Sequence, residues 1–259
     1  MKEIIQYEIK KMEQKHNIKI LFAVESGSRA WGFSSQDSDY DVRFVYIRHP
    51  EWYLSIDDKR DVIEVPINNL LDINGWDIRK ALKLFRKSNP SLMEWLSSEI
   101  VYHDAYGFKH ELVKLRERVF SPKASIHHYL NMAKGNYRDY LQGEQVKIKK
   151  YFYVLRPLLA CMWIEKYNMN PPILLQDMVN KMIVDSEVKR EIEELLRSKI
   201  AGEEFNFEKR IDVLNQFIEE GFAHLTEISS TYSCDMIDPT AELDELYRKY
   251  LRLVWDFTK

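Results

Sequence analysis

The chain has 259 residues, 45% of them hydrophobic and 31% charged, which is the composition of a soluble globular protein with one large domain or two modest ones. Its net charge of −3 excludes a uniformly basic protein, so any contact with RNA requires a local basic surface. The two cysteines, Cys161 and Cys234, stand far apart and indicate neither a disulfide framework nor a cysteine metal site.

The first 16 residues predict a charged amphipathic helix without the continuous apolar core of a signal peptide. The longest apolar run, Pro157 to Ile164, is too short to cross a bilayer, which takes about 20 residues. We therefore expect a cytoplasmic protein with no membrane partner.

The apolar segment Ile18–Glu25 predicts a β-strand that leads into Gly27 and Ser28. Gly27 provides a tight turn, and Ser28 offers a hydroxyl and a backbone N–H at the expected start of a short helix, where phosphate oxygens are favoured. Arg29 adds a guanidinium beside the turn. This segment predicts a site for the phosphates of a nucleotide.

Asp39 and Asp41 occupy alternate positions where a second strand is expected. Because alternate side chains of a strand share a face, the two carboxylates should lie about 7 Å apart on one side of the sheet. Such a pair can hold one divalent ion or bridge two, with Mg²⁺ or Mn²⁺ expected. Arg43 follows on the same face, where it contacts the nucleotide or forms a structural ion pair.

Residues 61–67 and 70–73 predict a hairpin, because Asn68 and Asn69 between them tolerate the backbone conformations of tight turns. A helix is expected over residues 76–87, with Asp77 in its first turn. The polar face of this helix carries four basic residues: Arg79, Lys80, Lys83 and Lys87. This face is either solvated, or one cation, Lys80 first among them, faces the triphosphate or the acceptor.

These motifs resemble the DNA polymerase β-like nucleotidyltransferase superfamily, and within it the RNA-ligase-associated branch. The resemblance rests on residues 27–32, 37–43 and 72–80 and on Asn89-Pro90. Asn89 and Pro90 also have a structural explanation, because they suit the start of a helix. It implies an α/β (α+β) domain with a small mixed sheet. It also implies an EC 2.7.7-type enzyme that transfers a nucleoside monophosphate from an NTP, with ATP expected, to an acceptor hydroxyl such as an RNA end, and releases pyrophosphate.

The superfamily usually supplies a third carboxylate from a neighbouring strand. Asp72 is the first candidate here, at the expected end of a strand just before a helix, and Glu64 in the partner strand is the alternative. The resemblance implies that this residue completes the metal site with Asp39 and Asp41 and helps to deprotonate the acceptor.

Beyond Ser121 and Pro122 nearly every segment has helical periodicity. We therefore expect a nucleotidyltransferase domain over residues 1–121 and an all-helical domain over residues 122–259 that closes the cleft. Helices are expected over residues 124–142, 144–167, 185–199, 205–225 and 240–255. The last three offer structural packing or a homodimer surface.

Lys149, Tyr153 and Arg156 line one stripe of the helix expected over residues 144–167. Together with Lys150 they are expected to meet the nucleotide or the acceptor phosphate. Solvated side chains are the competing interpretation. Two other functions remain open. One is an adenylyltransferase that modifies a protein or a small molecule, and the other is a non-catalytic nucleotide-binding partner protein.

Overall fold

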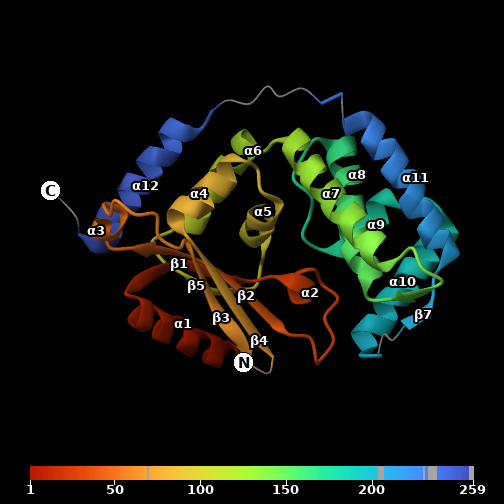
Figure 1. The fold of residues 1–259 in the computed structure, drawn as a ribbon, viewed down its shortest axis with the longest axis horizontal. Helices are drawn as coiled ribbons and strands as arrows, with labels where there is room; N and C mark the ends of the chain where they lie inside the picture. Colours follow the sequence, from red (N-terminus) through yellow and green to blue (C-terminus); the bar gives the residue numbers. More distant parts are fainter. Residues whose placement is uncertain (69, 204–206, 230, 233–237, 257–259) are drawn as a thin grey trace. The chain divides into compact units, whose positions relative to one another are not determined.

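The computed structural model describes residues 1–68, 70–203, 207–229, 231–232 and 238–256 (Figure 1). Asn69 of the expected turn, Cys234, and residues 205 and 206 of one expected helix lie outside these ranges. The chain divides into two compact units. The first unit comprises Met1–Ala30, Asp39–Val119 and Met236–Lys259, and the second comprises Trp31–Ser38 and Phe120–Asp235.

The first unit is built on a five-stranded sheet in the order β3-β4-β2-β1-β5. Its strands are β1 (Ile18–Glu25), β2 (Tyr40–Arg48), β3 (Val62–Asn68), β4 (Leu71–Asp77) and β5 (Val101–Asp104). β2 and β4 are parallel and the other neighbours are antiparallel. The mixed sheet and its helices confirm the predicted α/β fold class.

Helices cover both faces of this sheet. α1 (Lys2–His16) packs on one face, where Val42 and Phe44 of β2 join its core. Val45 and Ile47 point to the opposite face, because neighbouring strand residues alternate, and they pack with the helices there. Those helices are α4 (Ile78–Arg86), α5 (Pro90–Ser97), α6 (Phe108–Val119) and α12 (Thr240–Trp255). Two short helices, α2 (Gly27–Ala30) and α3 (Pro50–Tyr53), complete the unit.

Among the described residues of the second unit, the regular structure is helical apart from one short antiparallel pair of strands, which the sequence did not predict. Its helices are α7 (Pro122–Tyr140), α8 (Lys150–Tyr167), α9 (Leu175–Met182), α10 (Ser186–Ala201) and α11 (Asp212–Ser229). The strands are β6 (Gln145–Lys147) and β7 (Phe207–Lys209), so α8 and α11 begin later than expected. In the part of the chain that the structure describes, no helix has the length and apolar character needed to span a membrane.

The division into units corrects the expected boundaries in two places. α12 groups with the sheet rather than with the helical domain, because Leu243, Leu246 and Tyr250 are buried in the core of the first unit. Residues 31–38 group with the helices instead. Phe33 stacks on Phe152 with ring centroids 4.8 Å apart, and the backbone N–H of Leu175 donates to the carbonyl of Trp31 at 3.1 Å. The turn between the two sequence motifs is therefore part of the second unit.

Candidate active site

The Gly27 turn packs directly against Asp41. β1 and β2 pair with Glu25 opposite Val42, so the end of one strand meets the start of the other. Gly27 has φ of 60°, in the left-handed region that favours glycine. A Cβ atom at this position would lie 2.0 Å from Oδ2 of Asp41, so any side chain would clash. The structure therefore brings together the predicted phosphate turn and the predicted carboxylate motif.

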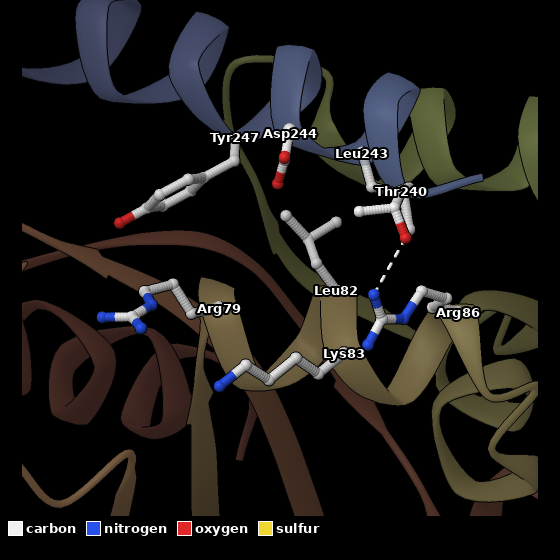
Figure 2. A pocket seen from close by; sticks show the side chains of 8 residues that line it. All are labelled: Arg79, Leu82, Lys83, Arg86, Thr240, Leu243, Asp244 and Tyr247. Carbon is white, nitrogen blue, oxygen red and sulfur yellow. Dashed lines mark hydrogen bonds between the residues drawn. The ribbon is translucent and has the colours of Figure 1, made fainter. Parts of the chain in front are cut away.

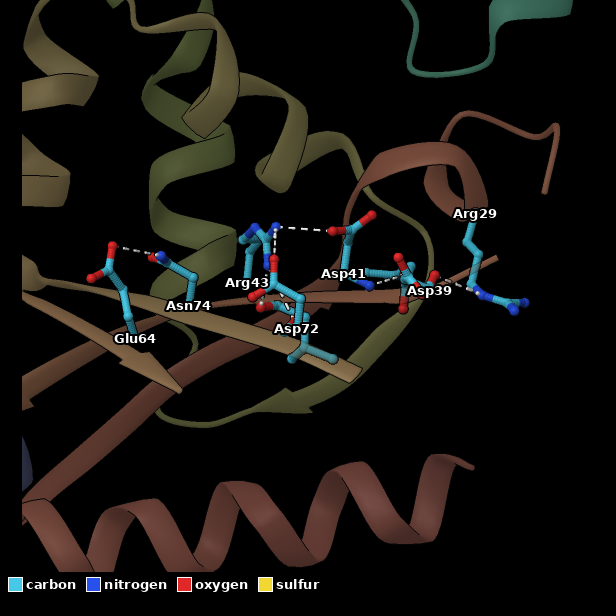
Figure 3. A network of polar contacts seen from close by, with 9 residues as sticks. Arg29, Asp39, Asp41, Arg43, Glu64, Asp72 and Asn74 are labelled. Carbon is cyan, nitrogen blue, oxygen red and sulfur yellow. Dashed lines mark hydrogen bonds and ion pairs between the residues drawn. The ribbon is translucent and has the colours of Figure 1, made fainter. Parts of the chain in front are cut away.

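Asp41 and Asp72 lie side by side on the parallel strands β2 and β4, where they are register partners. Arg43 bridges them, with Nη2 at 3.0 Å from Oδ1 of Asp41 and 2.8 Å from Oδ2 of Asp72 (Figure 3). Its Nη1 also donates to the carbonyl of Asp72 at 3.2 Å. Of the two interpretations of Arg43, these contacts show the structural ion pair.

The carboxylates of Asp39, Asp41 and Asp72 interact electrostatically at the edge of the sheet that carries them. Burial raises the pKa of Asp41 above its ordinary value; the Arg43 guanidinium opposes this rise, and the charges of Asp72 and Asp39 add to it. Asp39 lies directly before β2 and is exposed. A cation placed among these three carboxylates would therefore be strongly attracted.

Arg29 and Ser28 lie in α2 beside the carboxylates. The Nε of Arg29 donates to the carbonyl of Asp39 at 3.2 Å, and its guanidinium lies 3.8 Å from the centroid of the Tyr40 ring. Ser28 is half-buried. These contacts hold Arg29 at the rim of the site, next to the residue that begins the carboxylate motif.

Glu25 supports the site by holding the backbone of Asp41, a role that the sequence motifs did not indicate. This carboxylate is fully buried; Oε1 accepts the backbone N–H of Asp41 at 2.8 Å, and Oε2 accepts the Tyr102 hydroxyl. Burial raises the pKa of Glu25, and the Tyr102 hydrogen bond opposes this rise. The signal in the sequence was an acidic residue that ends an apolar strand just before the Gly27 turn.

Asp72 was expected at the end of a strand, and the structure places it near the start of β4 instead. It is the second residue of β4, which continues to Asp77 before α4 begins. Glu64, the alternative, lies opposite Asn74 and forms an ion pair with Arg60. The contacts therefore favour Asp72 as the carboxylate that completes the pair made by Asp39 and Asp41.

Lys80 lies away from the carboxylates. Asp77 is the last residue of β4 and lies about 16 Å from Asp72 at the usual rise of a strand. Lys80 follows Asp77 in the chain and pairs with Asp61 at 3.0 Å. Asp77 itself caps α4, accepting the N–H of Arg79 at 2.9 Å. The structure does not place Lys80 beside Asp41.

The four predicted residues of the second unit are on or next to α8. Lys149 is its exposed N-cap residue, and the Nζ of Lys150 lies 4.1 Å from the centroid of the Tyr140 ring and 4.8 Å from that of Tyr153. Burial, with the neighbouring Lys149 and Lys147, lowers the pKa of Lys150. Arg156 is buried over Trp31, 4.4 Å from the ring centroid, so it is not a solvated side chain. Nucleotide contact by these residues stays a prediction.

The donor chemistry of the carboxylate edge suits a hard divalent cation, because Asp39, Asp41 and Asp72 supply only oxygen. Within the described ranges, no three His, Cys, Asp or Glu side chains converge closely enough to form a ready metal site. Arg43 lies between Asp41 and Asp72, so a cation shared by those two requires its guanidinium to move. The residues fit the metal by chemistry, and their side chains must rearrange to hold it.

The site has a glycine turn that packs on Asp41, and Asp41 lies beside Asp72 on the neighbouring parallel strand. This arrangement is that of a polymerase β-like nucleotidyltransferase. The chain belongs to RlaP, the RNA repair pathway DNA polymerase beta family, whose model matches residues 1–249. The family resemblance that the motifs indicated is thus confirmed.

The chain is 53% identical over 255 residues to "Uncharacterized protein YcgL" of Bacillus subtilis (strain 168), covering 98% of each. It also has a likeness to the crystal structure of a nucleotidyltransferase-like protein from Exiguobacterium sibiricum. That likeness has a TM-score of 0.33 and 13% identity, and covers 88% of this chain and 75% of the other.

Proposed function

We propose that the protein transfers a nucleoside monophosphate from an NTP to an acceptor hydroxyl and releases pyrophosphate. The observation that carries the proposal is the contact between the Gly27 turn and Asp41, which is the register partner of Asp72, in a member of a polymerase β family. Attack on an α-phosphate needs the triphosphate anchored on one side and carboxylates on the other. The Gly27 turn and the aspartates at this edge of the sheet support these two roles.

Each residue has a distinct role in the proposed reaction. Gly27 and Ser28 bind the triphosphate through the turn, and Arg29 pairs with its negative charge. Asp39, Asp41 and Asp72 hold a divalent cation, Mg²⁺ or Mn²⁺, and Asp72 takes up the proton of the attacking hydroxyl. When bound, the cation neutralises the charge that develops around the α-phosphate and lowers the pKa of the acceptor.

Two residues organise these carboxylates. Glu25 fixes the backbone of Asp41 through its N–H, and Arg43 sets the orientation of the Asp41 and Asp72 side chains. The cluster of Lys150 with Tyr140 and Tyr153 supports a nucleotide contact in the second unit, since a cation beside aromatic rings suits phosphate and base.

The proposed acceptor is an RNA end, which the description of the family supports, and ATP is the first nucleotide to test. A protein or small-molecule acceptor would use the same carboxylates and differ only in what receives the nucleotide. The experiment therefore has to identify the labelled product as well as detect the reaction.

The test incubates the purified protein with α-labelled NTPs, Mg²⁺ or Mn²⁺ and separated RNA, protein and small-molecule fractions of a cell extract. The Asp39→Asn/Asp41→Asn variant should lose transfer, whereas Glu3→Gln/Glu8→Gln, which removes two negative charges from α1, should retain it. Label in RNA supports the RNA-end transferase, and label in another fraction supports the alternative acceptor. Equal labelling by wild type and the aspartate variant would refute the site assignment.

A further inference from the structure

α4 provides a local basic surface on a chain whose net charge is −3. The helix carries Arg79, Lys80, Lys83 and Arg86 with no acidic residue, and Lys87 follows at its C-cap position. Lys80 pairs with Asp61. The other four cations are exposed, and within the residues that the structure describes none of them lies within 4.0 Å of a carboxylate oxygen in an ion pair.

This helix forms a wall of two cavities within the first unit. A cavity of about 210 Å³ lies between α4 and α12, with Arg79, Lys83 and Arg86 on one wall and Asp244 and Tyr247 on the other (Figure 2). Arg86 reaches across it, since its Nη1 donates to Oγ1 of Thr240 at 2.8 Å. Three cations face one carboxylate here, so the cavity favours an anion.

The second cavity, of about 430 Å³, lies along the same helix and includes the rings of Trp52 and Tyr53. Arg79 and Lys83 line both cavities, so the two adjoin along α4. Carboxylates including Asp61 balance the charge of this second cavity. The second cavity therefore contributes aromatic surface to the proposed site, and a base can stack there beside the cationic cavity.

The spacing of the cations selects the kind of anion. Arg79, Lys83 and Arg86 follow one another at four and three residues, so they form a row about 10 Å long on one helix face. A compact anion needs cations that converge on one point, whereas a row suits phosphates repeated along a chain. The row begins just after Asp77, which lies about 16 Å along β4 from Asp72, so its first cation is away from the carboxylates.

We propose that α4, with the cavity between α4 and α12, binds the phosphate backbone of a single-stranded nucleic acid. The role of this strand as the acceptor rests on the proposed function, because only a transferase needs to hold an acceptor. The binding itself depends on the cations of α4 and not on the carboxylates.

The experiment measures fluorescence anisotropy of a short labelled single-stranded RNA with the full chain, without NTP, over a range of salt concentrations. Arg79→Gln/Lys83→Gln removes the two cations of α4 that line both cavities, and Lys2→Gln/Lys10→Gln removes two from α1 on the other face of the sheet. The α4 variant should bind about tenfold more weakly, with a salt slope lower by about 1.4, while the α1 variant matches wild type. Thermal unfolding of both variants shows that each is folded.

Equal RNA affinity of wild type and the α4 variant would overturn the proposal, as would complete displacement of the RNA by pyrophosphate at matched phosphate concentration. The Asp39→Asn/Asp41→Asn variant separates this inference from the proposed function. This variant should lose transfer and still bind RNA through α4, whereas wild-type protein that binds RNA through α4 and transfers no nucleotide would refute the function alone.

Discussion

Gly27 has an unusual backbone conformation and also contacts Asp41 of the candidate site. Its positive φ and its approach to Asp41 leave no space for a side chain. The approach places the backbone of the turn within reach of whatever the Asp41 carboxylate binds. A change at Gly27 should therefore affect the fold and the site together.

Gly27→Ala should destabilise the protein by roughly 1–3 kcal/mol and abolish transfer, because the new methyl group displaces Asp41 from a strained turn. Urea unfolding and the transfer assay measure the two effects. Gly135→Ala is the matched control: it lies inside α7 with nothing near its Cβ position, and should be neutral or stabilising by up to about 1 kcal/mol. An active Gly27→Ala protein would contradict the assigned turn.

Arg43 is the second residue that tests the site. Arg43→Gln removes the cation that keeps Asp41 and Asp72 together, so the two carboxylates repel each other and the melting temperature should fall. Added Mg²⁺ should raise the melting temperature of Arg43→Gln more than that of wild type, because a divalent ion can replace the lost charge. Arg60→Gln, which removes the partner of Glu64, should show no such response. Equal Mg²⁺ responses in all three proteins would argue against metal at these carboxylates.

At the scale of elements, β4 shows why part of the site could not be predicted. The Gly-Ser turn and the alternating aspartates are local patterns, so their meeting was predictable from the sequence. Asn74 and Gly75 do not favour a strand, so the sequence pattern predicts a strand that ends at residue 73. Pairing with β2 and β3 on both sides extends β4 to Asp77, and only these long-range contacts move Lys80 away from the site. Glu25 was missed for a similar reason, since its partner Tyr102 is distant in sequence.

The N-terminus of α4 gives a prediction about pH. Asp77 caps the helix, and its burial raises its pKa from 3.8 to about 6. The folded state therefore holds this proton more tightly than the unfolded state, and stability falls as the pH rises from about 4 through about 6, by roughly 3 kcal/mol. Asp77→Asn keeps a capping oxygen and cannot ionise, so its unfolding free energy should lack this decline.

Chemical unfolding of wild type and Asp77→Asn at several pH values between 4 and 7 measures the difference. Asp185→Asn is the control, because Asp185 caps α10 in the same way but at an exposed position. Parallel pH curves for wild type and Asp77→Asn would contradict the assignment of this decline to Asp77.

At the scale of the whole molecule, the grouping of α12 with the sheet was beyond the reach of sequence patterns. Its apolar stripe fits any core of suitable shape, and only the contacts of Leu243, Leu246 and Tyr250 decide which core it joins. The same holds for Trp31 and Phe33, whose place in the helical unit has no periodic signal. The expected boundary near residue 121 rests on the change to helical periodicity, and one division between the two compact units falls between Val119 and Phe120.

Hydrogen exchange tests this grouping. Leu246→Ala should destabilise the first unit by about 2–5 kcal/mol and speed amide exchange in α4, α6 and the sheet, with little change in α7 and α8. Leu225→Ala, in the core of the second unit, should have the reverse pattern. Faster exchange in α7 and α8 on mutation of Leu246 would place α12 with the helical unit.

The same grouping has a consequence for the order in which the protein can fold as it is synthesised. The ribosome makes residues 31–38 and 120–235 before α12, so every segment of the second unit has emerged while the first unit still lacks its last helix. Vectorial synthesis usually lets the N-terminal domain fold first. Here the first unit cannot complete its core until α12 has been made. We therefore expect the helical unit to complete its core first.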